Sequence, residues 1–364
     1  MMGTASLRHL GQSIWLDTLS RQLLTSGTLR RYIDDYGVTG VTSNPTILRR
    51  AIAGTLDYDD ELCAARRHGD TDTEHLVYAS ALEDVRAASE LFRQTWETSQ
   101  GRGGWVSIEV PPEHAYDVVP TIEWAQQLAK QANRPNVLIK VPGTPAGVTA
   151  TEELIAAGIP VNVTLLFSVG QYIAAAASYL RGLERRRRLG QSLSVASVAS
   201  VFVSRWDQAA NHSLPPGWRD RLGVAMAHQI YADQLRILQT PRWASLAAEG
   251  AKPQRLLWAS TSVKNADLPP SFYARRLALP DTINTMPEQT LLALTAEGTI
   301  PAVSSAELAQ ARTTPESLAE RGIDAPRLGE ALQRQGVHLF AHDWQRLLDS
   351  VEEMPSPSHR QAAV

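Results

Sequence analysis

Cysteine is almost absent from this sequence. Cys63 is the only one in 364 residues, so no disulfide can form within the chain and a reducing compartment is expected. Long hydrophobic runs are also missing. No stretch approaches the roughly 20 apolar residues of a membrane-spanning helix, and the first residues lack the apolar segment of a secretory signal. The formal net charge of -3 offers no excess positive charge for nucleic acid or anionic membranes. We expect a soluble cytoplasmic protein with neither as a partner.

Eight short apolar runs, each bounded by turn residues, predict β-strands. They are residues 13–18, 40–44, 105–110, 136–141, 161–167, 197–203, 256–261 and 281–286. The stretches between them have the periodicity of amphipathic helices, and glycines such as Gly37 stand just past helix ends, where a left-handed cap is expected. Thr149 and Glu152 have the spacing of a capping box and predict a helix start.

Strands that alternate with helices can form an open doubly wound sheet or a closed (β/α)8 barrel. The placement of polar residues favours the barrel, because catalytic groups of barrel enzymes stand at the C-terminal ends of many strands. Here those ends carry Asp17, Asn44, Glu109, Lys140, Thr164, Ser200 and Ser262. We therefore predict a single (β/α)8 TIM-barrel domain with additional helices over residues 1–353. The Pro- and Ser-rich residues 354–364 are expected to form a flexible tail.

Lys140 is the misfit in the apolar strand of residues 136–141. Burying an unpaired ammonium group is costly, so a lysine retained there needs a reason. A neutral lysine amine can form a Schiff base with a ketone, and Asp17 and Glu109 could move the protons that this chemistry requires. Simpler readings remain open: Lys140 could extend to solvent, Asp17 could cap a helix, and Glu109 could form an ion pair at the rim.

Several motifs together resemble the transaldolase family. They are "GVTSNPTI" at 40–47, "IKVPGTPAG" at 139–147, "NVTLLFS" at 162–168, "ASVFVSR" at 199–205, "WASTSVKN" at 258–265 and "DTINTMPE" at 281–288. Any one of them alone is a weak signal, but their order and their span from about Trp15 to Glu288 make the set specific.

The resemblance implies a class I aldolase-type transferase on a (β/α)8 barrel, with no metal and no other cofactor. Such an enzyme moves a dihydroxyacetone unit from a ketose phosphate, fructose 6-phosphate or sedoheptulose 7-phosphate, to an aldose phosphate, as in the pentose phosphate pathway of carbohydrate metabolism. By the same resemblance, Lys140 forms the Schiff base and Asp17 is the acid/base at the hydroxyl group next to the bond that breaks. Glu109 and Thr164 handle the water of imine formation and hydrolysis.

The resemblance also implies a set of substrate-binding residues. They are Asn44, Asn162, Ser200, Phe202, Arg205, Ser262 and Lys264. Arg205 and Lys264, assisted by Ser262, would bind the phosphate. Lys264 stands where shorter members of the family carry arginine, and residues 266–280 diverge from the family pattern, so the acceptor sugar stays open.

Alternative functions remain. Related fructose 6-phosphate aldolases tend to have Tyr at the position of Phe202 and Gln at that of Glu109, so this chain has the transferase-like pair. A transferase or aldolase with a non-standard acceptor in a specialised pathway, and a catalytically silent sugar-phosphate-binding barrel, are the other candidates. His338 and His342 lack a third ligand, which argues against a metal site. The sequence leaves open whether the protein is a monomer or a homodimer.

Overall fold

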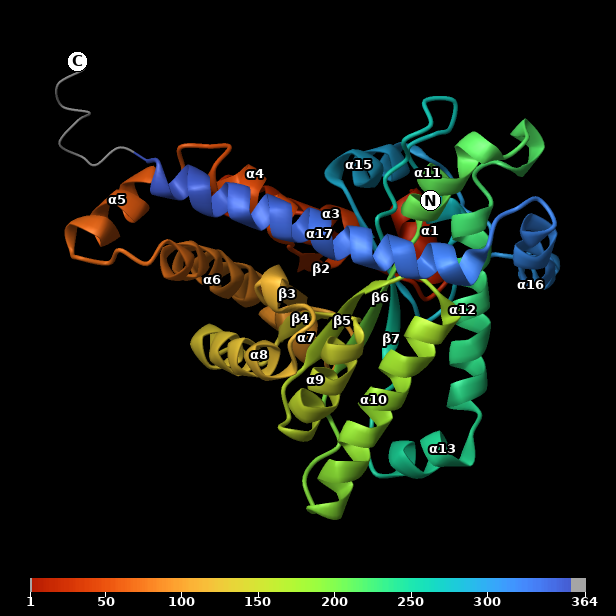
Figure 1. The fold of residues 1–364 in the computed structure, drawn as a ribbon, viewed down its shortest axis with the longest axis horizontal. Coiled ribbons are helices and arrows are strands. Elements are labelled where there is room, and N and C mark those ends of the chain that lie inside the picture. The colour runs from red at the N-terminus through yellow and green to blue at the C-terminus, as the bar shows by residue number, and fades with distance from the viewer. Residues whose placement is uncertain (1, 355–364) are drawn as a thin grey trace.

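The computed structural model describes residues 2–354, and its strands form a closed parallel barrel (Figure 1). The strands are β1 (Ser13–Leu16), β2 (Val38–Thr42), β3 (Trp105–Glu109), β4 (Val137–Pro142), β5 (Val161–Leu166), β6 (Ser197–Phe202), β7 (Arg255–Ala259) and β8 (Ile283–Met286). Each strand pairs with the next in sequence, and β8 closes on β1. The prediction of a (β/α)8 barrel is confirmed. The expected tail lies, apart from Met354, outside the described residues.

Helices surround the barrel and fill the long intervals between strands. They are α1 (Gly3–His9), α2 (Arg21–Thr25), α3 (Thr28–Tyr36), α4 (Pro45–Ile52), α5 (Asp59–Arg67), α6 (Thr73–Leu91), α7 (Arg93–Thr98), α8 (Val118–Ala132), α9 (Pro145–Ala156), α10 (Val169–Arg188), α11 (Ser204–Ala210), α12 (Leu222–Leu238), α13 (Pro241–Ala248), α14 (Phe272–Arg276), α15 (Glu288–Ala296), α16 (Ser305–Ala319) and α17 (Ala325–Glu352), with 3-10 turns η1 (Pro112–His114), η2 (Asn211–Ser213) and η3 (Pro216–Trp218). No helix within residues 2–354 combines the length and apolar composition needed to cross a membrane.

The structure corrects one predicted helix start and excludes one alternative role for Asp17. Helix α9 begins at Pro145, where the side chain of Thr144 accepts a hydrogen bond from the Gly147 N–H, because proline suits the first helical turn and threonine suits the cap. The predicted start at Thr149 is therefore wrong. Asp17 does not cap the helix that follows β1, since the side chain of Ser20 caps α2.

The strand β2 also lies two residues earlier than predicted, at Val38–Thr42 instead of 40–44. Gly37 precedes it in the left-handed conformation, with a φ of 68°, and ends α3 as expected. Asn44 consequently stands beyond the strand, where its side chain accepts a hydrogen bond from Ile47 N–H and caps α4. The earlier end of β2 places Thr42 as its last residue.

Inside the barrel, apolar side chains give way to polar side chains toward the C-terminal ends of β3, β4 and β5. The apolar inward side chains belong to one hydrophobic cluster, which includes Trp15, Trp105, Leu138, Val198, Leu257 and Ile283. Since side chains alternate along a strand, the inward residue two positions after Leu138 is Lys140. The register places Glu109 of β3 and Asn162 of β5 directly beside Lys140.

The C-terminal helix α17, 28 residues long, lies across the C-terminal ends of the strands (Figure 1). It contacts α4, α6, η1 and β5. Gly336 allows this close approach, because a Cβ atom there would lie 2.9 Å from the side chain of Leu165. Gln333 Nε2 donates hydrogen bonds to the carbonyl oxygens of Gly143 and Leu165, at 2.9 and 3.0 Å. The helix therefore forms part of the wall at the mouth of the barrel.

Candidate active site

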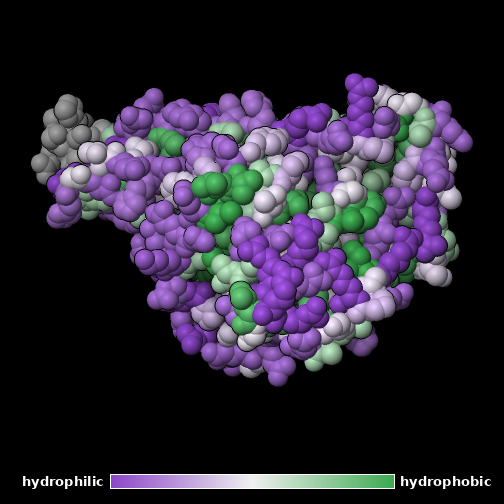
Figure 2. Space-filling view, turned by 60° about the horizontal axis from the view of Figure 1, so that its bottom comes forward, coloured by the Kyte–Doolittle hydropathy of each residue, from purple (hydrophilic) through white to green (hydrophobic). Residues whose placement is uncertain are grey.

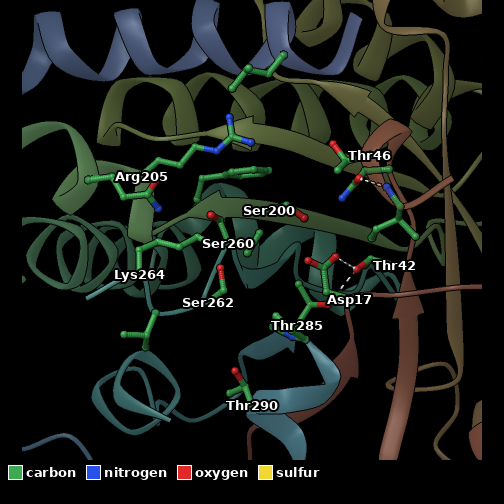
Figure 3. Close-up of a pocket in the computed structure, with 18 of the residues that line it drawn as sticks. Asp17, Thr42, Thr46, Ser200, Arg205, Ser260, Ser262, Lys264, Thr285 and Thr290 are labelled. Carbon is green, nitrogen blue, oxygen red and sulfur yellow. Dashed lines mark hydrogen bonds between the residues drawn. The ribbon is translucent and has the colours of Figure 1, made fainter. Parts of the chain in front are cut away.

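A cavity of about 1020 Å³ opens at the C-terminal end of the barrel (Figure 3). The structure brings most of the predicted site residues to its wall, namely Asp17, Asn44, Lys140, Thr164, Ser200, Phe202, Arg205, Ser262 and Lys264. Glu109 and Asn162 lie directly behind this wall, in contact with Lys140 and Ser200 respectively. The residues predicted from separate strand ends thus converge on one cavity.

Lys140 points into the barrel and is paired with Glu109. Their side chains are only 5% and 2% exposed, and Lys140 Nζ lies 2.9 Å from Glu109 Oε2. The same nitrogen donates a hydrogen bond to the carbonyl oxygen of Ser43, at 2.9 Å. Extension of Lys140 to solvent and a rim position for Glu109 are both excluded by this burial.

Burial raises the pKa of Glu109, although the positive charge of Lys140 opposes the shift. A carboxylate with a raised pKa binds a proton more readily than an exposed glutamate does. Glu109 is therefore suited to accept the proton that Lys140 must lose before its amine can attack a carbonyl carbon.

Asp17 follows β1 and belongs to a chain of hydroxyl groups that the sequence did not reveal. Its Oδ1 accepts a hydrogen bond from Thr42 Oγ1 at 2.9 Å, and Thr42 Oγ1 lies 2.9 Å from Thr285 Oγ1. Figure 3 shows the three side chains together on one side of the cavity. Burial raises the pKa of Asp17, while the charge of Lys140 and the Thr42 hydrogen bond oppose the shift. Asp17 is thus a stronger base than an exposed aspartate.

A buried hydrogen-bond network lies on β3, β5 and β6 beside Lys140. Ser200 Oγ donates to Asn162 Oδ1 at 2.6 Å, and Asn162 Nδ2 donates to Ser107 Oγ at 3.2 Å. Thr164 Oγ1 is buried and has no hydrogen-bond partner among the residues that the structure describes. Its hydroxyl group is therefore free to bind a water molecule or a substrate.

Arg205 stands at the opposite side of the cavity from Asp17, near Ser262 and Lys264 (Figure 3). Its guanidinium carbon lies 5.2 Å from the ring centre of Phe202 and 5.8 Å from that of Phe340 in α17. Its buried Nη1 has no hydrogen-bond partner within residues 2–354, and burial lowers the pKa of Arg205. The two rings hold a cation whose donors remain available to an anion.

Sequence reasoning missed the contribution of α17 to this cavity. Leu332, Gln335, Leu339 and Phe340 line it. No local pattern could have placed them there, because an amphipathic helix does not show which partner its apolar face contacts. Thr42 and Thr285 could have been found, since they lie inside quoted motifs and Thr285 is two residues after the inward Ile283.

Asp207 anchors the helix that carries Arg205. It is 2% exposed, its Oδ1 accepts a hydrogen bond from Gly223 N–H at 3.1 Å, and its Oδ2 accepts one from Tyr273 O–H at 2.9 Å. These bonds join α11 to α12 and α14. Burial raises the pKa of Asp207 to about 6.

This shift predicts a pH dependence of stability. Because the folded state binds the Asp207 proton more tightly than the unfolded state, its contribution to the free energy of unfolding falls as pH rises from about 4 to about 6, by up to about 3 kcal/mol. Urea unfolding of the parent and of Asp207→Asn at about pH 4.5 and 7.5 measures the free energy of unfolding. The difference in this free energy between the two proteins should change with pH. Asp267→Asn, at an exposed site, is the control. A difference that is the same at both pH values contradicts the prediction.

The fold and the cavity define a class of protein: a (β/α)8 barrel with a buried lysine, two carboxyl groups and a cationic wall at the C-terminal ends of its strands. The sequence model of the family described as "Transaldolase/Fructose-6-phosphate aldolase" matches residues 14–351. This chain belongs to the transaldolase/fructose-6-phosphate aldolase family.

Curated relatives are similar over nearly their whole length. The chain is 42% identical to a protein named transaldolase from Thiobacillus denitrificans, with 96% of this chain and 99% of the relative covered. It is 40% identical to a transaldolase from Neisseria gonorrhoeae, with coverage of 94% and 98%, and 40% identical to one from Mycolicibacterium smegmatis, with 96% of each covered.

Proposed function

We propose that this protein is a transaldolase that transfers a dihydroxyacetone unit from a ketose phosphate to an aldose phosphate through a Schiff base on Lys140. The observation that carries the proposal is the buried pairing of Lys140 with Glu109, at 2.9 Å, beside a cavity open to substrate. Full-length similarity to curated transaldolases supports the same activity.

Imine formation uses Lys140, Glu109 and Thr164. Glu109 takes a proton from the ammonium group, and the neutral amine attacks the ketone carbon of the sugar. The carbinolamine then loses its hydroxyl group as water, which receives the proton that Glu109 had taken. The free hydroxyl group of Thr164 holds this water, and the same steps in reverse hydrolyse the imine at the end of the cycle.

Carbon–carbon cleavage uses Asp17. Its carboxylate accepts the proton of the sugar hydroxyl group two carbons from the iminium carbon. The bond between the carbon that carries this hydroxyl group and the carbon next to the iminium carbon then breaks. Its electron pair moves toward the iminium nitrogen, and an enamine and an aldose phosphate result. When the enamine attacks an acceptor aldehyde, Asp17 returns the proton to the new alkoxide. The raised pKa of Asp17 favours acceptance of the proton at the cleavage step.

Polar side chains around Lys140 hold the three-carbon fragment. We assign this role to Asn44, Asn162 and Ser200. Asn162 and Ser200 are fixed by their mutual hydrogen bond and Asn44 by its cap on α4, so they can bind hydroxyl groups of the fragment without first becoming ordered. Phe202 forms an apolar side of the same cavity.

Arg205, Lys264 and Ser262 bind the substrate phosphate in this proposal. Replacing Arg205 with alanine should raise KM for a ketose phosphate roughly 10- to 100-fold, the value of one lost charge-assisted hydrogen bond. Steady-state kinetics with fructose 6-phosphate and with unphosphorylated fructose separate the phosphate from the rest of the substrate. The control is Arg312→Ala, at an exposed site on α16. Equal losses with both sugars would refute the phosphate role.

The decisive test of the proposal is borohydride reduction in the presence of fructose 6-phosphate. The expected result is a covalent mass increase on the peptide that contains Lys140, which a sugar-binding barrel without catalysis would not show. A second assay separates transferase from aldolase. Cleavage should depend on an added aldose phosphate, whereas release of free dihydroxyacetone without any acceptor would favour an aldolase.

We also propose that the barrel and its additional helices act as one domain over residues 1–353, and that the enzyme works in the cytoplasm. The helix α17 supports the first point, because its residues line the same cavity as the strand ends. The free thiol Cys63 supports the second.

A further inference from the structure

A second cavity, of about 380 Å³, lies at the other end of the barrel. It is bordered by the first residues of several strands, among them Trp105 of β3, Ser197 of β6 and Ile283 of β8. Strands run away from this end toward the proposed active site, so the two cavities are separated by the apolar interior of the barrel. Figure 2 turns the lower end of Figure 1 forward and shows hydrophobic areas set among hydrophilic side chains.

The wall of this second cavity is largely apolar. Trp105, Val198 and Ile283 belong both to it and to the hydrophobic interior of the barrel. Leu235 and Leu238 of α12 form another side. A cavity of this size with apolar walls and a few polar groups is typical of a small-molecule site.

Positive charge exceeds negative charge around this cavity. Arg102 forms an ion pair with Asp281, but Arg255 and Lys252 have no carboxylate within ion-pair distance among the described residues. Arg255 is bound by neutral oxygen atoms, including the carbonyls of Asp281 at 3.2 Å, Arg102 at 2.6 Å and Thr282 at 2.9 Å. A half-buried guanidinium group with only neutral partners retains its attraction for an anion.

Burial lowers the pKa of Arg255 to about 10, so the group still carries its charge at neutral pH. Lys252 Nζ donates one hydrogen bond, to the carbonyl oxygen of Gln100, and an ammonium group has three donors. Both cations can therefore interact with a ligand without losing the bonds that hold them in place.

The glycine-rich loop of residues 101–104 shapes one wall. Gly101 and Gly104 have φ values of 74° and 83°, which glycine adopts without strain. The Gly101 carbonyl oxygen accepts a hydrogen bond from Trp105 Nε1 at 2.8 Å, and a Cβ atom at Gly101 would lie 3.4 Å from Lys252 Nζ. The loop thus keeps Lys252 and Trp105 close together.

We propose that this cavity is a second ligand site, which takes a small monoanion with a compact or planar apolar body, of the kind an aromatic carboxylate has. The apolar part contacts Trp105, Val198 and Ile283, and the anionic group lies near Lys252 and Arg255. The proposal depends on the N-terminal end of the barrel alone and stands whether or not Lys140 forms an imine.

Isothermal titration of the full chain with 2-naphthoate tests the proposal, with neutral 2-naphthylmethanol as the matched probe. Naphthoate should bind at least about tenfold more tightly than the alcohol, the effect of one favourable charge interaction. Leu235→Trp should fill the cavity and abolish binding. The control is Leu292→Trp on α15, because Leu235 and Leu292 are each 41% exposed and Leu292 does not line either cavity.

Lys252→Gln keeps a donor for the Gln100 carbonyl oxygen and should weaken naphthoate binding about tenfold. Three results would overturn the proposal: equal affinity for the two probes, unchanged binding by Leu235→Trp, or loss of binding in Arg205→Ala, which would place the probe in the active-site cavity. A failed borohydride experiment would leave all three measurements unaffected, so the two proposals fail separately.

Discussion

Replacing Lys140 with alanine should lower transaldolase activity by about 10⁴-fold or more, because it removes the amine that forms the covalent intermediate in the proposed mechanism. Borohydride in the presence of fructose 6-phosphate should then add no mass to the peptide. The measurement is kcat/KM for sugar-phosphate exchange together with mass spectrometry of the reduced protein. Lys130→Ala, at an exposed site on α8, is the control. Activity within about tenfold of the parent would exclude Lys140 as the nucleophile.

The same substitution should destabilise the fold. In the structure Lys140 pairs with the buried Glu109, so alanine at position 140 would leave Glu109 without its counter-ion. Removing one partner of a buried pair costs about 3–5 kcal/mol. The cost should shrink as pH falls, because the raised pKa of Glu109 lets the carboxyl group take up a proton.

Urea unfolding at two pH values measures this cost. The double variant Lys140→Ala with Glu109→Gln removes the carboxylate and should recover much of the lost stability while remaining inactive. If the single variant is as stable as the parent at high pH, the two side chains do not form a charged pair in solution.

Replacing Asp17 with asparagine should lower kcat by about 10²- to 10⁴-fold, the usual contribution of a general base. Asparagine keeps the shape of the side chain and can still accept the hydrogen bond from Thr42. In the proposed mechanism imine formation uses Lys140 and Glu109 and does not need Asp17, so borohydride should still trap the donor sugar. A variant that still forms the borohydride-trapped imine but no longer turns over has lost a residue that acts at carbon–carbon cleavage.

The matched control for this experiment is Asp34→Asn, at an exposed site on α3. If borohydride no longer traps the donor sugar in Asp17→Asn, Asp17 acts in imine formation and not at carbon–carbon cleavage. Burial raises the pKa of Asp17, so its ionised form destabilises the folded state. At pH values above that pKa, the Asp17→Asn protein should therefore have a higher free energy of unfolding than the parent. This gain in stability would show that the loss of activity is not caused by unfolding.

Much of the fold could be predicted from local signals. Each strand is an apolar run bounded by turn residues, and such runs are visible without knowledge of their neighbours. The main errors were the position of β2 and the start of α9. In both places a side-chain cap on the following helix sets the point at which that helix begins. Asn44 and Thr144 satisfy backbone N–H groups that follow them, and this satisfaction depends on the path of the chain at the turn.

The candidate site was predicted less completely than the fold. Lys140 was conspicuous because a charged residue in an apolar strand is costly. Phe340 was not, because a phenylalanine in an amphipathic helix has nothing unusual about it. The Arg205 guanidinium carbon lies 5.8 Å from the centre of the Phe340 ring, and the two residues are far apart in the chain.

The sequence by itself determined where the eight strands lie along the chain, apart from the shift of β2, and which polar residues follow them, because both depend on neighbours along the chain. Only the tertiary structure decided the partners of those groups. Closure of the barrel and its register set Glu109 beside Lys140, and the earlier end of β2 set Thr42 against Asp17. The packing of α17 onto the mouth placed a ring over Arg205. Such contacts depend on how segments distant in the chain pack together, and a local sequence pattern does not predict that packing.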